Sequence, residues 1–157
     1  MNISKRAIID FNNAIKLRPE YSTAYYYRAR AYYSLKEYSR AAGDFTKAIE
    51  LKSTDADYYR ERGVTYLELQ MYDEALADFN KAIELKPSDN TSYFYRGAAY
   101  HYLKQYDKAI IDYTKAIEIN SNFARAYHNR GLCYEKLGDN TRAQADFAKA
   151  RELGYNG

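Results

Sequence analysis

The sequence has 157 residues, of which 46% are hydrophobic and 29% charged, and this composition excludes a chain that stays disordered for lack of apolar surface. Lys and Arg number 24 against 21 Asp and Glu, so the formal net charge is only +3, with both signs interspersed. So small an excess provides no electrostatic footprint for nucleic acid or for an anionic membrane, and we expect neither as a partner.

The single cysteine, Cys133, excludes an internal disulfide, and no apolar run has the length of a membrane span or the form of a signal peptide. We therefore expect a cytoplasmic protein, although a removed export signal or an excised fragment would leave the same pattern. Cys133 lies in a predicted helix interior between Leu132 and Tyr134, where a small buried side chain is expected rather than a nucleophile.

The chain begins with half of a repeated unit, residues 1–21, and no first half precedes it. Four full units of 34 residues follow, at 22–55, 56–89, 90–123 and 124–157. The match between the second and third full units begins with Tyr59, Arg62 and Gly63 against Tyr93, Arg96 and Gly97. An internal repeat of this length determines the fold class.

Each full unit contains two runs in which apolar and small residues recur at intervals of three and four, which predicts two α-helices. The breaks between the runs are short, LKEY in the first unit and LQMY, LKQY and LGDN in the later ones, so the two helices should lie antiparallel. Asp55 and Asp89, or Ser53 and Ser88, are placed to cap helix starts. Nothing in the sequence suggests a strand.

The 34-residue helix-turn-helix unit resembles the tetratricopeptide repeat, TPR. In the unit 90–123 the family's pattern of aromatic, small, tyrosine and alanine positions falls on Tyr93, Gly97, Tyr100, Ala109, Tyr113 and Ala116. The resemblance covers the whole chain and implies an all-α, right-handed superhelical solenoid of antiparallel helix pairs, with about four and a half repeats in one array. The family's tryptophan position is always Tyr here, its leucine position before the small residue is always Arg, and its late proline survives only as Pro19 and Pro87.

Those arginines recur with the same period as a series of aspartates. The arginines are Arg28, Arg62, Arg96 and Arg130, and the aspartates are Asp10, Asp44, Asp78, Asp112 and Asp146. Charged residues in a packed helix seam need a partner, so we interpret the two series as structural ion pairs rather than as a phosphate-binding ladder. The spacing does not decide whether Arg28 pairs back to Asp10 or forward to Asp44.

One face of the predicted first helices does not carry the recurring residues, and in TPR arrays this face lines the concave groove, where the family holds an extended peptide or a partner helix. Packing demands the same residue in every unit, whereas here the residues differ from unit to unit. The predicted peptide-binding groove consists of Tyr26, Tyr27, Arg30, Tyr33, Arg60, Val64, Leu67, Phe94, Tyr95, His101, Tyr102, Arg125 and His128. Its rings would contact apolar side chains while an arginine meets a carboxylate. The alternative is that these are surface tyrosines without a ligand.

The carboxylate clamp with which some TPR proteins bind acidic chaperone tails is not expected. The family's Lys, Asn, Asn, Lys and Arg positions would hold Tyr26, Arg30, Glu61, Ala98 and Tyr102, or, one unit later, Arg60, Val64, Tyr95, Leu132 and Lys136. Neither register supplies the clamp.

No catalytic motif or Gly-rich phosphate loop occurs, so we predict a non-enzymatic protein without a cofactor. His101 and His128 are the only histidines, and without a clear third ligand no metal site is expected. The sequence thus predicts a protein–protein interaction module that binds a peptide or a partner helix in its groove.

The competing interpretation is a structural or self-associating repeat segment. Solenoids normally end on a polar capping helix. Here Ile8, Phe11, Phe147 and Leu153 are expected to be partly uncovered, which allows either a longer array or end-to-end self-association. RNA binding ranks third, because acidic residues such as Glu61 and Glu68 share the aromatic face.

Overall fold

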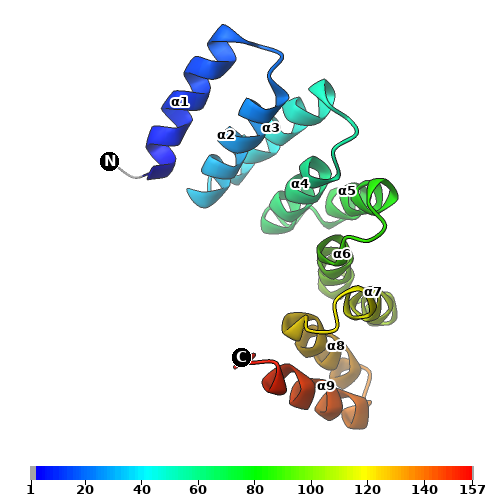
Figure 1. Cartoon of the computed structure of the whole chain (residues 1–157). Helices are drawn as coiled ribbons and strands as arrows, with labels where there is room; N and C mark the ends of the chain where they lie inside the picture. Colours follow the sequence, from blue (N-terminus) through cyan, green and yellow to red (C-terminus); the bar gives the residue numbers. More distant parts are fainter. Residues whose placement is uncertain (1–2, 157) are drawn as a thin grey trace. The chain divides into compact units, whose positions relative to one another are not determined.

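The computed structural model describes residues 3–156, which form nine α-helices and no strand (Figure 1). The helices are α1 (Ile3–Leu17), α2 (Ser22–Ser34), α3 (Tyr38–Leu51), α4 (Ala56–Glu68), α5 (Tyr72–Leu85), α6 (Asn90–Tyr102), α7 (Tyr106–Ile119), α8 (Ala124–Lys136) and α9 (Asn140–Glu152). One unpaired helix followed by four helix pairs confirms the predicted all-α solenoid of about four and a half repeats.

The chain divides into two compact units, Met1–Leu85 and Lys86–Gly157. In the first unit each helix from α1 to α5 packs against the next in sequence, and in the second unit α6 to α9 do the same (Figure 1). Contacts between sequence neighbours are what a repeat architecture requires, because each repeat buries its apolar side on the adjacent one. The single array over 1–157 stays a prediction.

A tight turn joins the two helices of each repeat. The second of its three residues adopts a left-handed backbone conformation, with φ of 61° at Lys36, 59° at Gln70, 58° at Lys104 and 81° at Gly138. In the first repeat the N–H of the following residue, Glu37, donates to the carbonyl of Tyr32 at 2.9 Å. This bond closes the C-terminus of the first helix and lets the second begin at once.

Aspartates cap the starts of two first helices, as predicted. The side chain of Asp55 accepts a hydrogen bond from the backbone N–H of Asp57, and that of Asp89 accepts one from Thr91. These bonds satisfy amides that have no partner inside the helix.

The core of each repeat is an aromatic ring of the second helix placed against a small residue of the first. Phe79 is fully buried, and a Cβ atom added to Gly63 would lie 2.7 Å from its Cε1 atom. Gly131 meets Phe147 at the same 2.7 Å, and Gly97 meets Tyr113 at 3.0 Å. The recurring glycine therefore reflects the close approach of a ring, not a need for unusual backbone angles.

Gly43 in α3 has no such neighbour, because a Cβ atom added there would meet nothing within 4 Å. We expect Gly43→Ala to stabilise the protein by about 0.5–1 kcal/mol, since glycine in a helix interior costs conformational entropy relative to alanine. Urea unfolding followed by circular dichroism measures the change. A loss of stability would contradict the open space around this position.

The arginine and aspartate series pair within each repeat, which settles the question the spacing left open. Arg28 donates to Asp44, from Nε at 2.6 Å and from Nη2 at 2.7 Å, and not to Asp10. The same two-point contact joins Arg62 to Asp78, Arg96 to Asp112 and Arg130 to Asp146. A planar guanidinium matches the two carboxylate oxygens in this geometry.

The third guanidinium nitrogen reaches back to the second helix of the preceding repeat. Nη1 of Arg28 donates to Asn12 in α1 at 2.7 Å, and Nη1 of Arg62 donates to Thr46 in α3 at 3.0 Å. In the second compact unit Nη1 of Arg130 donates to Thr114 in α7 at 3.0 Å. Each of these arginines therefore joins three helices, which explains why arginine occupies the position the family usually gives to leucine.

Candidate functional site

The first compact unit places predicted groove residues on α2 and α4. Tyr26 is half-buried, because its ring stacks on Tyr58 with centroids 4.8 Å apart and contacts Phe45 at 5.8 Å. Burial, together with the charge of Glu61, raises the pKa of Tyr26 to about 12. Tyr26, Tyr58 and Phe45 thus form a packed aromatic cluster. The hydroxyl of Tyr26 remains protonated at physiological pH.

Tyr27 and Tyr33 extend this surface along α2. Tyr27 is 45% exposed and stacks on Phe11 of α1 with ring centroids 5.9 Å apart. The hydroxyl of Tyr33 donates to Glu68 of α4 at 3.1 Å, so it links the two first helices. Val64 and Leu67, the predicted apolar groove residues of α4, are partly exposed.

Arg60, the predicted groove arginine of α4, already has carboxylate partners. Its guanidinium donates to Asp57 at 2.6 Å and to Glu61 at 3.3 Å, so carboxylates of its own helix already engage it. Arg30, by contrast, is exposed, lies 5.8 Å from the centroid of the Tyr26 ring and has no carboxylate partner among residues 3–156. Among the predicted groove residues of this unit, Arg30 is therefore the arginine without a carboxylate partner.

In the second unit Phe94 is a core residue, contrary to the prediction that it lines the groove. It is only 2% exposed and packs on Tyr113 at 5.7 Å and on Phe123 at 4.8 Å between ring centroids. The guanidinium of Arg125 lies over its ring at 5.1 Å. Arg125 is exposed and without a carboxylate partner in the described part of the chain, so Phe94 supports the cation rather than contacting a ligand itself.

Tyr95 and Tyr102 are the predicted groove tyrosines of α6. Tyr95 is half-buried with its ring edge against Phe94 at 5.3 Å, whereas Tyr102 is 58% exposed. The second unit therefore also has an exposed tyrosine, Tyr102, and an exposed arginine without a carboxylate partner, Arg125.

The two histidines are held by aromatic neighbours. The ring of His101 lies 5.5 Å from Tyr106, and its Nε2 atom is buried without a hydrogen-bond partner among residues 3–156. Burial, and secondarily the charge of Lys136, lowers the pKa of His101. His128 packs at 4.6 Å on Tyr155, and burial lowers its pKa as well.

Within residues 3–156 we find neither a cluster of metal ligands nor a thiol that ionises at neutral pH. Across 3–156 no three His, Cys, Asp or Glu side chains are grouped so that they could hold a metal ion. Cys133 is fully buried, and burial raises the pKa of its thiol to about 12, so the thiolate is not formed at neutral pH.

The histidines make stability depend on pH in a defined direction. Because their pKa values in the folded state lie below the ordinary 6.5, the unfolded chain binds more protons between the two values. The free energy of unfolding should therefore fall as the pH is lowered below about 6.5. His101→Gln should flatten this slope in urea titrations between pH 5 and 7, with His128→Gln as the comparison. A protein that became more stable on acidification in this range would exclude the burial of both rings.

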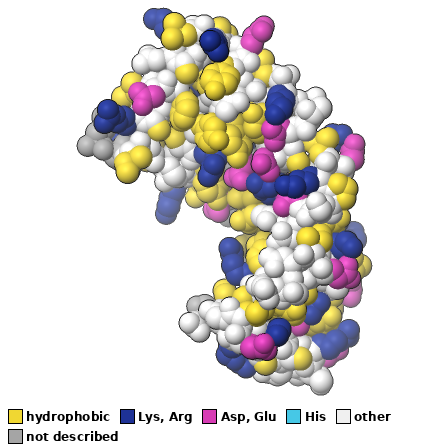
Figure 2. Space-filling model, in the orientation of Figure 1, with side chains coloured by type: hydrophobic (Ala, Val, Ile, Leu, Met, Phe, Trp, Pro, Cys, Tyr) yellow, Lys and Arg dark blue, Asp and Glu magenta, His cyan; other side chains and the backbone are white. Residues whose placement is uncertain are grey.

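Figure 2 shows that hydrophobic side chains gather over α1 and α2 on the face it presents, while positive and negative side chains are intermixed elsewhere on that face. The sequence had indicated the same mixing of charge. The predicted groove residues are thus distinguished by exposed rings and single arginines, not by a field of one sign.

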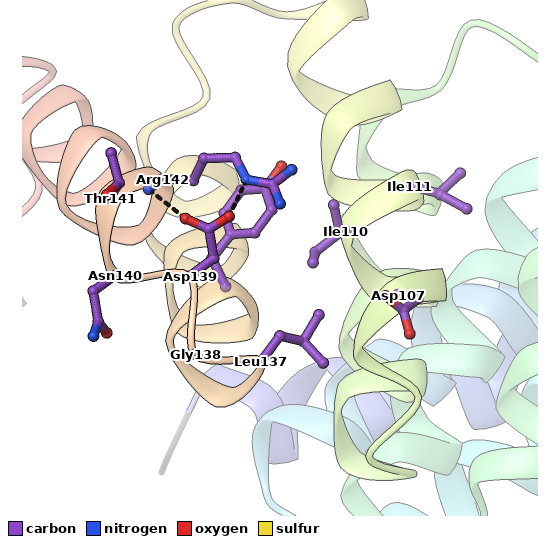
Figure 3. A pocket seen from close by; sticks show the side chains of 10 residues that line it. Asp107, Ile110, Ile111, Leu137, Gly138, Asp139, Asn140, Thr141 and Arg142 are labelled. Atoms are coloured by element: carbon purple, nitrogen blue, oxygen red, sulfur yellow. Dashed lines mark hydrogen bonds and ion pairs between the residues drawn. The ribbon is translucent and has the colours of Figure 1, made fainter.

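A surface pocket of about 780 Å³ lies between α7 and the turn that joins α8 to α9 (Figure 3). Its apolar wall includes Ile111, which is 67% exposed, and Leu137, which is 48% exposed. The charged residues of its polar wall already bind each other, since the carboxylate of Asp139 accepts hydrogen bonds from Nε and from the backbone N–H of Arg142. The sequence interpretation missed this pocket, although a signal existed: the isoleucine pair of α7 stands where the first repeat has Ala and Gly.

No helix within residues 3–156 combines the length and the apolar character needed to cross a membrane.

Comparison with known sequences confirms the TPR resemblance. Sequence models of the tetratricopeptide repeat match residues 4–56, 56–89 and 124–153, and a model described as TPR repeat matches 99–138. Among curated proteins none matches the chain.

Solved structures similar to this chain include MamA, the Arabidopsis OM64 TPR domain and YrrB. MamA is 26% identical with a TM-score of 0.89, over 98% of this chain and 95% of its own. The Arabidopsis OM64 TPR domain is 26% identical with a TM-score of 0.71, over 73% of this chain and 94% of its own. YrrB, described as a TPR protein with an unusual peptide-binding site, shares the fold at 24% identity and a TM-score of 0.82, over 96% of this chain and 78% of its own.

Proposed function

Because this chain belongs to the tetratricopeptide repeat family of protein–protein interaction modules, we propose that it binds peptide segments on its first-helix surfaces without catalysing a reaction. The first-helix surface of each unit is defined by its exposed tyrosine and its free arginine. In the first unit these are Tyr27 and Arg30, and in the second Tyr102 and Arg125.

The observation that carries the proposal is the combination of exposed tyrosines with arginines that have no carboxylate partner among residues 3–156. Tyr27 is 45% and Tyr102 58% exposed. Arg30 and Arg125 lie over aromatic rings and have no carboxylate partner among residues 3–156. Exposed aromatic residues and arginines with a supported side chain are typical of binding hot spots.

The chemistry of these positions favours a peptide with an aromatic or apolar side chain next to a carboxylate. Half-buried Tyr26 and Tyr95 provide flat apolar contact area, and their rings are held by packing, so little side-chain entropy is lost on binding. An arginine already stacked on a ring is pre-oriented, and its donors can contact both oxygens of a carboxylate. Arg60 is excluded from this role because Asp57 and Glu61 hold it.

Peptide selection from a displayed random library tests the proposal without knowledge of the natural partner. Peptides selected on the intact protein should lose at least about tenfold in affinity with Tyr27→Ser and Arg30→Glu, or with Tyr102→Ser and Arg125→Glu, because hot-spot truncations cost about 2 kcal/mol or more. Titration calorimetry with the purified variants gives the dissociation constants.

Matched controls have an equal or greater exposure but lie outside the first-helix surfaces. Tyr21 is also 45% exposed and precedes α2, and Ile111 of α7 is 67% exposed. Tyr21→Ser and Ile111→Ser should leave the affinity unchanged. Equal affinities of wild type and of all four first-helix variants, in proteins of unchanged helicity, would remove the assignment.

A further inference from the structure

The net positive charge of the chain lies entirely in its second compact unit. Residues 86–157 contain 11 Lys and Arg against 8 Asp and Glu, whereas residues 1–85 contain 13 of each sign. Two cations of α8, Arg125 and Lys136, are exposed and have no carboxylate partner among residues 3–156. These two charges are therefore available to a ligand of the second unit.

Arg125 and Lys136 mark the two ends of the seam between α6 and α8. The guanidinium of Arg125 lies 5.1 Å from the ring centroid of Phe94 in α6. The positive charge of Lys136 helps to lower the pKa of His101 in α6, so its ammonium group lies near the other end of the same helix. Both cations thus face one surface, and both helices of that surface belong to the same compact unit.

The spacing of the two cations sets the length of what they can hold. They are eleven residues apart in α8, about three helical turns, so they lie on one face of the helix and about 16 Å apart along its axis. Glu135, the acid next to Lys136, projects about 100° away around the helix. Ala98 of α6 and Leu132 of α8 lie between the two cations along the helices and are partly exposed. The seam therefore presents a positive, an apolar and a second positive position in a row.

The corresponding first helix of the first unit carries the opposite charges. Asp57 and Glu68 of α4 occupy the repeat positions that Arg125 and Lys136 occupy in α8. Both acids already bind groups of their own unit, Asp57 an arginine at 2.6 Å and Glu68 a tyrosine hydroxyl at 3.1 Å. Charge complementarity decides which ligands a surface attracts and which it repels, so the two first-helix surfaces should differ in specificity.

Building on the proposed function, on which this specificity depends, we infer that the seam between α6 and α8 selects extended peptide segments with the pattern acid–x–apolar–x–acid. Side chains alternate along an extended chain that advances about 3.3 Å per residue, so two acids four residues apart point to one side and lie about 13 Å apart. The flexible stem of Lys136 covers the remaining distance.

Each position of the segment has a partner in the seam. One acid contacts the guanidinium of Arg125 through both oxygens, the other contacts the ammonium of Lys136, and the apolar side chain between them packs on Leu132 and Ala98. Arg125 is not among the positions of the carboxylate clamp, so the pair is not a variant of that clamp.

The peptide SESLSES, blocked by acetyl and amide groups at its ends, is the probe. Added to the intact protein, it should bind in a 1:1 complex that shifts the amide NMR resonances of α6 and α8 and not those of α2 and α4. Arg125→Gln and Lys136→Gln should each weaken binding about tenfold, the effect of removing a charged hydrogen-bond partner. Lys108→Gln, which removes an exposed positive charge from α7, should leave the affinity unchanged.

Two further peptides make the test specific. SSELESS has the same composition and charge, but its acids are two residues and about 7 Å apart, so it reaches only one cation and should bind about tenfold more weakly. SQSLSQS has no acid, and its affinity should not change with Lys136→Gln. The inference is overturned if SESLSES shows no saturable binding at millimolar concentration, or if it binds wild type, Arg125→Gln and Lys136→Gln with the same affinity.

Library-selected peptides separate that result from a failure of the proposed function. If selected peptides lose affinity with Tyr102→Ser but carry no paired acids, the first-helix surface binds peptides and only the acidic specificity is wrong. If no selected peptide depends on first-helix residues of either unit, the proposed function and the specificity are both wrong.

Discussion

Replacing Asp78 by alanine is expected to destabilise the protein by about 3–5 kcal/mol, because it leaves the Arg62 guanidinium without its carboxylate in a packed seam. The side chain of Asp78 is 6% and that of Arg62 17% exposed. Burial raises the pKa of the Asp78 carboxyl while Arg62 opposes that shift, so the carboxylate depends on this one partner. Urea unfolding at pH 7 measures the loss.

The matched control is an ion pair of the same length on the surface. Lys81 and Glu84 are joined at 2.7 Å, but their side chains are 39% and 68% exposed. Glu84→Ala should leave the unfolding midpoint close to that of wild type, because water and salt screen exposed pairs. A double replacement, Arg62→Met with Asp78→Leu, should recover most of the stability that Asp78→Ala loses, since no uncompensated charge remains. Equal effects of Asp78→Ala and Glu84→Ala would show that the pair does not hold the repeat together.

Truncation of the central ring, Phe79→Ala, is expected to cost about 3–5 kcal/mol, the range for a fully buried aromatic side chain. Phe79 is 0% exposed and fills the space that the missing side chain of Gly63 leaves open. The loss combines the transfer free energy of the ring with the cavity that remains. Met71→Ala, at a residue 38% exposed, provides the surface comparison and should change stability little.

Gly63 and Phe79 should also be energetically coupled. Gly63→Ala alone is expected to destabilise, because its Cβ atom would lie 2.7 Å from the ring of Phe79. In a Phe79→Leu background the contact is relieved, and Gly63→Ala should become neutral or stabilising through its higher helix propensity. Additive effects of the two substitutions would refute the ring-on-glycine packing.

The repeat unit, its two helices and the ion-pair series were predictable because each follows from periodicity, and packing imposes the same residue type in every repeat. The partner of Arg28 was not predictable. Asp10 and Asp44 are 18 residues before and 16 residues after it, and the choice depends on how the antiparallel helices of one repeat align.

Residues outside the repeat pattern were harder to assign. Phe94 shares its repeat position with Tyr26 and Arg60, so the pattern gave it no core role. Its burial arises from Phe123, which stands where two earlier repeats have the capping aspartates Asp55 and Asp89 and covers the ring. A nearby acid likewise decided that Arg60 is engaged while Arg30 is free, and such contacts depend on side-chain conformations that spacing does not specify.

The most direct measurement of the central claim is amide NMR mapping of a library-selected peptide on the isotope-labelled protein. If the first-helix surfaces bind the peptide, the largest shifts will fall on α2 and α4 around Tyr27 and Arg30, or on α6 and α8 around Tyr102 and Arg125. Shifts confined to α7 and α9, around the pocket of Ile111 and Arg142, would contradict the account and move the binding site to the second helices.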